Sequence, residues 1–579
     1  MSDTEKKHIR SNDRPILLYA ADIIAKHPFL TTAVACLLCM SLTSTSKVSG
    51  ISATVPVLTF AFCGVFGTSC ICYKSPTHNK KQLYTVLCIA SVLFALSFGR
   101  MLIDSNRPQL VVLMSGIAFI IASSIYLYSI KALNTKRLVL LLFILGFLFR
   151  FAYIMSVKLP YRQHDLGSIE KMDGHLGYMA YISYNLRLPN TDVRDIYQFY
   201  HPPLHHIIAA LWARILNIFG MEQKYIWENV QILTLYYSSC CMILSYKIFR
   251  RMKLSGTGLV TAMAVICFNP TFFILSGSIN NDILSITLIL GALYNALCWY
   301  ESRSLGRIIC TALCVGFSMM AKLSGWMAAP AIAFIFIFVF FKDIKNFKKY
   351  IVQFSVFLGI SIPLGMWWSI RNLIKFDVPF DYVYELSEKS GQYIGNVPVM
   401  KRLFDFNPYQ LQNVGDQFKF YGGKYNEYNP LIALFKTSAF DELYTVSYYP
   451  HVAHWDKILF WSVVIVGLIS FFAMIYIWFN DRKMNIIHKI FTAIIYTVYM
   501  LFYYRFCLQY PQVCTQNIRY AVPAIVLGAY FFGRMVSDLG KCKKKKFRIP
   551  AKITAVCLCT IAGIYCLSSS IFYYITFMS

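Results

Sequence analysis

Apolar runs of about twenty residues recur along almost the whole chain, and this pattern limits the folds open to it. A helix of that length spans the hydrocarbon core of a bilayer at about 1.5 Å per residue. Of the 579 residues, 57% are hydrophobic and only 14% are charged, whereas soluble proteins carry about 25% charged residues. The sequence therefore predicts an all-α polytopic membrane protein with about fifteen transmembrane helices.

The basic residues fall into short clusters between the apolar runs, in a chain with a net charge of +28. Such clusters are typical of the cytoplasmic loops of membrane proteins. The long loops lack the strip of basic and aromatic residues that single-strand binders use, so no nucleic-acid partner is predicted. The predicted cytoplasmic clusters are 74–81, 131–137, 247–253, 342–349 and 541–546.

The alternation of apolar and polar segments predicts five parts and two sizeable extracytoplasmic loops. The first outer loop lies within the third part, and the second loop forms the fourth part. The five parts are a cytoplasmic N-terminal segment at 1–27, four accessory transmembrane helices at 28–130, a membrane module at 131–373 with its first outer loop at 159–227, a large outer loop at 374–456, and C-terminal transmembrane helices at 457–579.

The basic turn at 131–137 sets the predicted sidedness of the first outer loop. If this turn is cytoplasmic, the span near 136–158 delivers the polar stretch Pro160–His206 to the outer side. The short apolar run at 204–219 is predicted to be a juxtamembrane or re-entrant helix. A crossing there would place every later basic cluster on the outer side, against the charge rule.

The stretch Pro160–His206 carries the first candidates for chemistry. Asp165 and Asp173 follow the outer end of a span, where a carboxylate can be partly desolvated and still meet a substrate, as a general base requires. The alternative is that both are ordinary solvated loop acids. Pro202 and Pro203 stiffen the chain and aim Tyr200 and His201 in one direction; a plain helix N-terminus explains the same prolines equally well.

Several charged residues at the outer ends of spans suit a phosphate or a metal ion. Lys322, Arg371 and Arg519 can bind the phosphate of a lipid-linked substrate, and interfacial snorkelling is the alternative. Asp282 either caps a helix or, with Asp165 and Asp173, holds a divalent cation such as Mg²⁺ or Mn²⁺. Five histidines, His164, His175, His201, His205 and His206, also suggest a metal, but none shows the spacing of a zinc site.

The order of these motifs resembles that in polytopic glycosyltransferases that use polyprenyl-phosphate-linked sugars. These enzymes form the GT-C fold group, and the resemblance is to the branch of protein O-mannosyltransferases and the aminoarabinose lipid A transferase. It covers about residues 136–530. The matching motifs are Asp165, Met172 to Tyr178, Leu188-Pro189, Tyr200 to Leu204, Ser276 to Asp282, Ala321 to Gly325 and Trp367 to Asn372.

The resemblance implies roles for individual residues of the 131–373 catalytic module and beyond. An acid of the first outer loop would be the catalytic base or orient the acceptor, carried over to Asp173 with Asp165 as the alternative. Many relatives have a second acid where this chain has Gly174, which leaves that choice open. The remaining predicted site residues are His201 as a further catalytic group, Lys322, Arg371, Arg519, His175, Tyr178 and Tyr200 for the donor and its phosphate, and Asp282 as a second acidic site.

The implied activity is transfer of a hexosyl or pentosyl group from a polyprenyl-phosphate donor to a lipid, glycan or protein acceptor. The reaction would run on the extracytoplasmic face with inversion, in a bacterial cytoplasmic membrane rather than the endoplasmic reticulum, and serve the cell envelope. The alternatives are a lipid-linked oligosaccharide flippase or transporter, and a polysaccharide ligase or polymerase. The near absence of charge within the spans argues against a transport path.

Overall fold

The computed structural model describes most of the chain. The described residues are 23–24, 26–44, 50–73, 78–103, 105, 107–156, 159, 163–380, 382–406, 427–440, 454–481, 483–542 and 544–578. Most of the predicted N-terminal segment 1–27 lies outside them, as do residues 407–426 and 441–453 of the predicted large outer loop.

Within the described ranges, every regular element is a helix, apart from one isolated bridge between Tyr393 and Gln512. In this part of the chain, ten helical segments are long and apolar enough to cross a membrane. They are α6 (Pro108–Ser129), α7 (Thr135–Ser156), α10 with α11 (Gln223–Arg251), α14 (Asp282–Ser302), η2 with α16 (Leu323–Lys342), η3 with α17 (Ile344–Phe376), α21 (Trp455–Asn480), α22 (Ile486–Gln509), α23 (Val522–Gly540) and α24 (Arg548–Met578).

The bent pair α12 (Gly256–Cys267) and α13 (Pro270–Gly277) would form an eleventh span. The all-α polytopic architecture is thus confirmed, while the number of about fifteen spans stays a prediction. The other described helices are α3 (Pro28–Ser44), α4 (Gly50–Tyr73), α5 (His78–Ile103), α8 (Gly174–Asn185), α9 (Leu204–Ile218), α15 (Leu305–Ala321), α18 (Val399–Phe404) and α20 (Pro430–Phe440).

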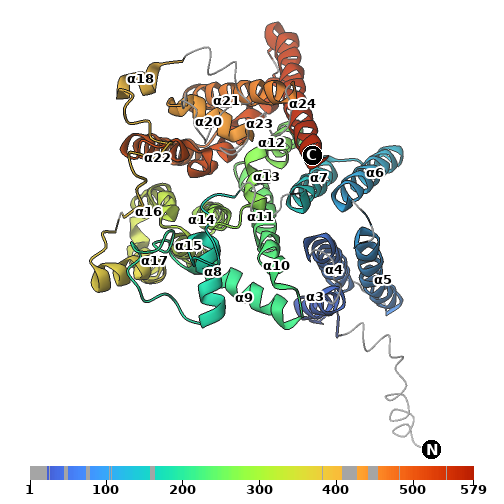
Figure 1. Cartoon of the computed structure of the whole chain (residues 1–579). Helices are drawn as coiled ribbons and strands as arrows, with labels where there is room; N and C mark the ends of the chain where they lie inside the picture. The colour runs from blue at the N-terminus through green and yellow to red at the C-terminus, as the bar shows by residue number, and fades with distance from the viewer. Residues whose placement is uncertain are drawn as a thin grey trace, which may run out of the picture. The chain divides into compact units, whose positions relative to one another are not determined.

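The chain forms two compact units. The first comprises residues 1–112 and 211–232, and the second comprises 113–210 and 233–579. In the first unit, α3, α4 and α5 pack on one another around a core of small and branched side chains, among them Cys39, Val57 and Ala61 (Figure 1). Small residues allow helix backbones to approach closely within a membrane.

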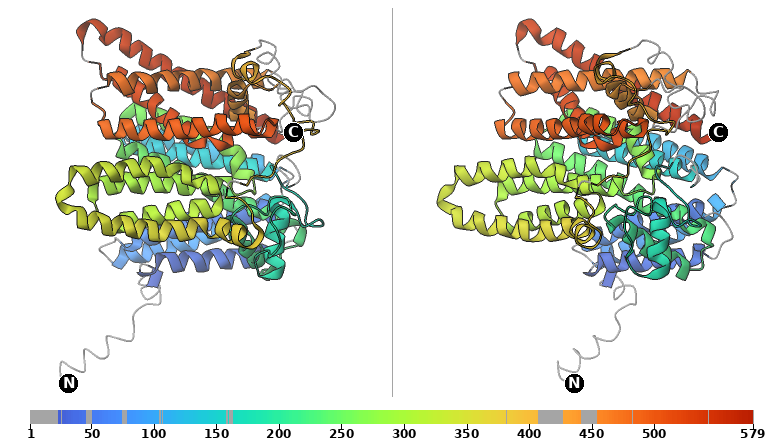
Figure 2. Two further views of the ribbon diagram at one scale, coloured as in Figure 1. Left: turned by 90° about the vertical axis from the view of Figure 1, so that its left-hand side faces the viewer. Right: turned by 60° about the vertical axis from the view of Figure 1, so that its left-hand side comes forward.

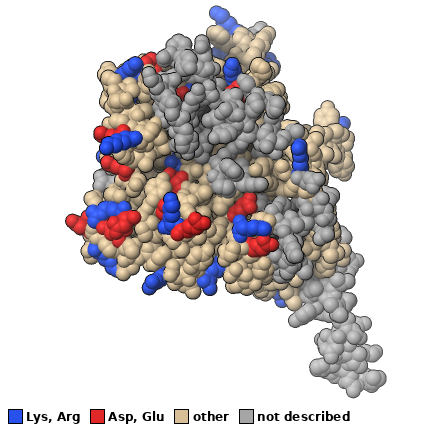
Figure 3. Space-filling view, in the orientation of Figure 1, with Lys and Arg blue, Asp and Glu red and all other residues tan. Residues whose placement is uncertain are grey.

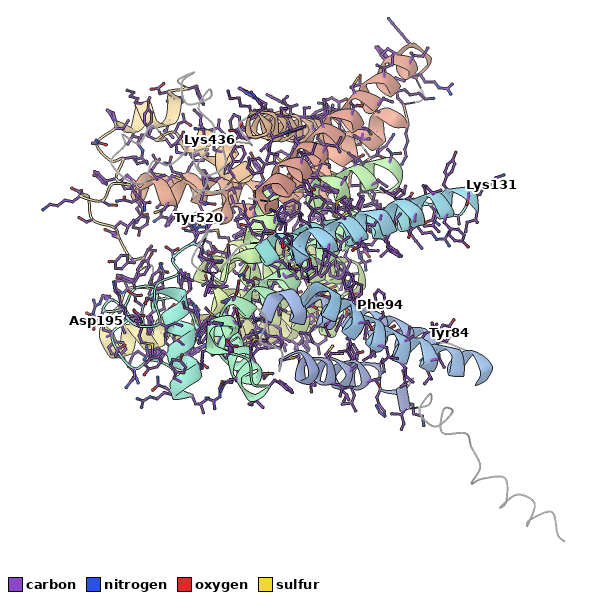
Figure 4. All side chains as sticks on the ribbon, turned by 45° about the vertical axis from the view of Figure 1, so that its right-hand side comes forward. Tyr84, Phe94, Lys131, Asp195, Lys436 and Tyr520 are labelled. Atoms are coloured by element: carbon purple, nitrogen blue, oxygen red, sulfur yellow. The ribbon has the colours of Figure 1, made fainter. Side chains whose placement is uncertain are left out.

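The helices of the second unit run side by side, so its loops gather at two opposite ends (Figure 2). One end carries α8, α18 and the chain that follows α17. The other carries the short turns between spans, such as the turn at 343–346 between α16 and α17. Lys131, in the turn before α7, lies far from Asp195 and Tyr520 in Figure 4.

A buried arginine supports the break between α12 and α13. Arg150 of α7 has no exposed surface and donates hydrogen bonds to the carbonyl oxygens of Cys267 (2.8 Å) and Ile266 (3.3 Å), at the C-terminal end of α12. It also donates to Ser238 Oγ (2.9 Å) and to its own helix at Gly146 O (2.8 Å). The last carbonyls of a helix have no partner within it, so the buried Arg150 side chain caps α12.

Replacing Arg150 by methionine is therefore expected to destabilise the protein by about 2 kcal/mol, the usual cost of leaving buried carbonyls unsatisfied. The measurement is the midpoint of thermal unfolding in detergent, with Arg107→Met, a change at an exposed arginine, as the control. An unchanged midpoint for Arg150→Met would show that water or lipid replaces the guanidinium.

Candidate active site

A cavity of about 1020 Å³ opens at the end of the second unit that carries α8. Segments far apart in the sequence line it: the loop before α8, the stretch 197–202, the start of α14, the turn 322–324, the chain 378–393 after α17, and residues 502–520. Seven of the predicted site residues lie on its wall. They are Asp165, His175, Tyr200, His201, Asp282, Lys322 and Arg519.

The loop before α8 is folded tightly enough to place Asp165 in this wall. Its carbonyl groups cap α8, because the backbone N–H groups of His175 and Leu176 donate to the carbonyls of Asp165 (3.0 Å) and Leu166 (2.9 Å). Gly174 has a φ of 69°, and a Cβ there would lie 2.4 Å from the Cα of Gly167. A side chain at 174 would therefore disrupt the loop, which explains why no second acid stands at this position.

Asp165 is held by partners from two other segments. The hydroxyl of Tyr197 donates to Oδ1 (2.5 Å), and the Arg519 guanidinium lies 3.4 Å from Oδ2. Burial alone would raise the pKa of Asp165, but Arg519, His175 and the Tyr197 hydroxyl outweigh it and lower the pKa to about 2. The carboxylate is therefore charged at neutral pH.

Asp282 is the first residue of α14 and is almost fully buried. Lys322 donates to its Oδ1, and Asn280 Nδ2 donates to its Oδ2 (3.2 Å). Arg519 lies 3.7 Å from Oδ2 as well, so the guanidinium stands between Asp165 and Asp282. Two acids and two bases thus alternate in the cavity wall, each compensating the charge of the next.

Asp282 was also predicted to hold a metal ion. No group of three or more His, Cys, Asp or Glu in the described ranges is arranged to hold a metal ion. Both carboxylate oxygens of Asp282 face cations or an amide instead. The divalent cation stays a prediction.

Three histidine rings stack beside the acids. His175 lies between His201 and His206, with ring centroids 5.3 and 5.2 Å away, and its Nδ1 is 3.0 Å from His206 Nε2. Burial lowers the pKa of His175 to about 4 and those of His201 and His206 well below the usual value. His205 Nε2 donates to the carbonyl of Ile279 (2.7 Å) and so fixes the turn that leads to Asp282.

The comparison with protein families adds the decisive observation. Residues 200–367 match the family described as dolichyl-phosphate-mannose-protein mannosyltransferase. This segment is similar to that mannosyltransferase family. The predicted resemblance is thereby confirmed, and the match covers less than a third of the 579 residues. A comparison with curated proteins found no match.

The segment that matches this family, residues 200–367, supplies only part of the cavity wall. His201, Asp282 and Lys322 lie within the matched residues, whereas Asp165 comes before them and Arg519 follows far behind. The acidic and basic groups of the site therefore come together only when the domain packs against the loop before α8 and the turn before α23.

The other three predicted site residues lie outside the cavity lining. The carboxylate of Asp173 accepts a hydrogen bond from the backbone N–H of Ser168 (2.7 Å) and precedes α8 as its N-cap. Tyr178 is buried, with its ring between those of Phe199 and His206. Asp173 therefore holds the loop before α8, and Tyr178 packs against residues behind the cavity wall.

Arg371 binds the chain between α8 and α9. Its guanidinium donates to the carbonyl of Pro189 (2.5 Å) and to Asn372 Oδ1 (2.7 Å), and it stacks on the ring of Trp368. The phosphate contact stays a prediction, and of its three predicted cations only Arg519 and Lys322 line the cavity.

Several cavity residues were not among the predicted site residues. Tyr197 holds Asp165, and the ring of Tyr520 lies beneath both Lys322 (4.8 Å) and Arg519 (5.0 Å). Tyr520 directly follows the predicted residue Arg519 in the sequence, and this position could have identified it. Arg505 also lines the cavity, but it lies within an apolar helix and carries no sequence signal beyond its charge.

Proposed function

We propose that the protein transfers mannose from a polyprenyl-phosphate donor to a hydroxyl group of a protein acceptor, on the extracytoplasmic face of a membrane and with inversion at the anomeric carbon. One observation carries this proposal: a single cavity brings the acids and the cations together, and part of its wall comes from the segment that matches the mannosyltransferase family. The coarser statement, that a multi-pass membrane protein carries a mannosyltransferase family domain, stands without the proposal.

The donor would place its phosphate on Lys322 and Arg519. Both cations line the cavity; the Arg519 side chain is buried and that of Lys322 is partly buried. A desolvated cation binds an anion more strongly than an exposed one. Next to them the wall becomes apolar, where the prenyl chain would lie. The apolar residues are Met319, Trp326, Met327, Met366, Phe502 and Phe506.

The acceptor would approach from the other side, past the chain 378–393. Several tyrosines of this chain line the cavity, among them Tyr382, Tyr384 and Tyr393. Asp165 would orient the acceptor hydroxyl, whose oxygen bonds to the anomeric carbon as the bond from that carbon to the phosphate oxygen breaks. The cations would stabilise the charge that the departing phosphate gains.

The positions of the basic turns support an extracytoplasmic site. Asp282 begins α14, and Arg303 follows its other end about 30 Å away at 1.5 Å per residue. The turn 343–346 and Lys131 lie at that same distant end, where the charge rule predicts the cytoplasm. Figure 3 shows acidic groups beside basic groups at the cavity end, instead of a uniform basic field.

The test compares two aspartates of one loop. Asp165→Asn is expected to lower the rate at which purified protein releases polyprenyl phosphate from polyprenyl-phosphate mannose about 100-fold, because it removes the charge that orients the acceptor. Asp173→Asn is expected to change that rate by less than about twofold, since the amide oxygen still accepts the Ser168 N–H.

Product analysis with a peptide rich in serine and threonine would follow the mannose. The proposal fails if the parent protein releases no lipid phosphate, or if Asp165→Asn is as fast as the parent. Equal losses in both variants would show that the whole loop, and not the cavity wall, sets the activity.

A further inference from the structure

A buried glutamine in the cavity wall has a side-chain oxygen that makes no hydrogen bond within the described residues. Gln198 lines the cavity, and only 4% of its surface is exposed. Within the described part of the chain, no donor reaches its Oε1. Buried polar atoms of native proteins nearly always have a partner, so an exception of this kind points to a specific role. A ligand that enters the cavity is the natural source of the missing donor.

The backbone at Gln198 is held in an uncommon conformation. Its φ is 68°, a value that residues other than glycine rarely adopt. Hydrogen bonds fix the chain on both sides: the carbonyl of Tyr197 accepts from the N–H of Gly174 (2.9 Å), and the carbonyl of Gln198 accepts from the N–H of His201 (3.3 Å). Such conformations persist where the surrounding contacts enforce them, and they are frequent at binding and active sites.

The sequence neighbour of Gln198 contacts one of the charged groups of the cavity. The hydroxyl of Tyr197 donates to Asp165 (2.5 Å), and Lys322 and Arg519 line the same cavity. In the proposed reaction, the sugar lies between a phosphate on these two cations and an acceptor hydroxyl near Asp165. The stretch that carries Gln198 therefore borders the space that the sugar would fill.

The chemistry of the side chain suits a neutral hydroxyl group. A carboxamide has an acceptor oxygen and a donor nitrogen, and a hydroxyl both donates and accepts. A hydroxyl can therefore pair with either end of the amide. The acceptor would enter past exposed residues such as Tyr384. A residue as buried as Gln198 is instead suited to the part of the substrates that lies deepest, which is the sugar.

We propose that the carboxamide of Gln198 binds one hydroxyl group of the donor sugar and thereby selects the sugar that the protein transfers. This inference rests on the proposed function and adds a specificity residue to it. A sugar that lacks this hydroxyl would leave the buried oxygen without a donor, so the protein would discriminate against it. Gln198 itself makes and breaks no covalent bond.

The experiment compares donors that differ by a single hydroxyl. Purified protein and a peptide rich in serine and threonine are given polyprenyl-phosphate mannose or its 2-, 3-, 4- or 6-deoxy analogue, and kcat/KM for release of polyprenyl phosphate is measured. Gln198→Met is expected to lower kcat/KM for the mannose donor about 30-fold. For one of the four deoxy analogues, the same variant should lower kcat/KM less than about threefold, because the contact is already missing.

Two further variants control for folding and for the loss of any glutamine. Gln223→Met is the same change at an exposed glutamine outside the lining, and is expected to leave kcat/KM unchanged for every donor. Gln198→Asn keeps a residue type that tolerates a positive φ, but its amide is one carbon shorter. It is expected to lose about tenfold of the discrimination against the same deoxy analogue, and it tests the contact even if the methionine variant does not fold.

The outcomes separate this inference from the proposed function. If the parent protein turns over none of the donors, the proposed function has failed and the inference fails with it. If the parent is active, the inference alone is overturned by a Gln198→Met variant whose kcat/KM for the mannose donor is within twofold of the parent value. A loss of equal size for all the donors also overturns it, because a purely structural role would slow every donor alike. So does a Gln198→Asn variant that discriminates among the donors as the parent does.

Discussion

Replacing Arg519 by leucine is expected to lower kcat about a thousandfold, the largest loss for any single change in the cavity. Arg519 is 7% exposed and contacts Asp165 and Asp282 at once. Its loss would remove a cation from the position of the departing phosphate and leave two carboxylates near each other without the charge between them. Tyr520, whose hydroxyl accepts from Arg519 (2.9 Å), would lose a partner too.

The direction of the accompanying pKa change gives a second measurement. Arg519 is the strongest of the groups that lower the pKa of Asp165, so the pKa of Asp165 should rise in the leucine variant. The activity that remains should therefore fall at a higher pH than in the parent as the pH is lowered, because Asp165 takes up its proton earlier.

A conservative change and a control define the role of Arg519. Arg519→Lys keeps the charge but not the planar pair of donors, and is expected to lose about tenfold less kcat than Arg519→Leu. Arg187→Leu, at an exposed arginine just after α8, is expected to leave kcat unchanged. A leucine variant that releases lipid phosphate at more than a tenth of the parent rate would rule out Arg519 as the main phosphate contact.

The membrane architecture was open to sequence reasoning because each span must satisfy its own backbone hydrogen bonds and match the bilayer thickness. Apolar length therefore identifies α14 or α21 from the local sequence. The polar stretch Pro160–His206 was recognisable because it interrupts this apolar pattern. Charged residues at a membrane are costly, so they usually mark a functional site. Asp165, His175, Tyr197 and His201 of this stretch line the cavity, together with residues of the segment that matches the mannosyltransferase family.

The choice between Asp165 and Asp173 was not open to sequence reasoning. The two residues share one loop, and the positive φ angles of Asp165, Gly167 and Gly174 decide which carboxylate faces the cavity. The partner of Asp165 stands 354 residues away. Likewise, Lys322 and Arg371 both lie at ends of spans that the sequence predicts to be outer. Only the structure shows that Arg371 binds the chain after α8 at Pro189.

A buried ion pair next to the cavity was also absent from the predictions. Lys436 of α20 and Glu427 form a salt bridge, and both side chains are almost without exposed surface. Around this pair, α20 is tied to the turn before Arg519: Gln516 donates to the carbonyl of Glu427 (3.0 Å), and the N–H of Ile518 donates to Thr437 Oγ1 (3.0 Å). The ion pair therefore packs against residues 516–518, which directly precede Arg519.

Replacing Lys436 by methionine is expected to destabilise the protein by about 3–5 kcal/mol, because Glu427 would keep a buried charge without its partner. The double variant Lys436→Met with Glu427→Gln is expected to recover most of that loss, since no charge remains to be desolvated. Unfolding midpoints in detergent for the parent, both single variants and the double variant give the coupling between the two side chains directly.

The pH dependence of this cycle distinguishes a buried charge from lost packing. Burial raises the pKa of Glu427 and Lys436 opposes that shift, so the pKa should rise further in Lys436→Met. The unfolded chain then releases a proton that the folded chain retains, and the stability of the variant falls as the pH rises above the usual glutamate pKa. The stability gap between Lys436→Met and the parent should consequently be wider at pH 8 than at pH 5.5, whereas a gap independent of pH would mean that the lysine contributes only its packing.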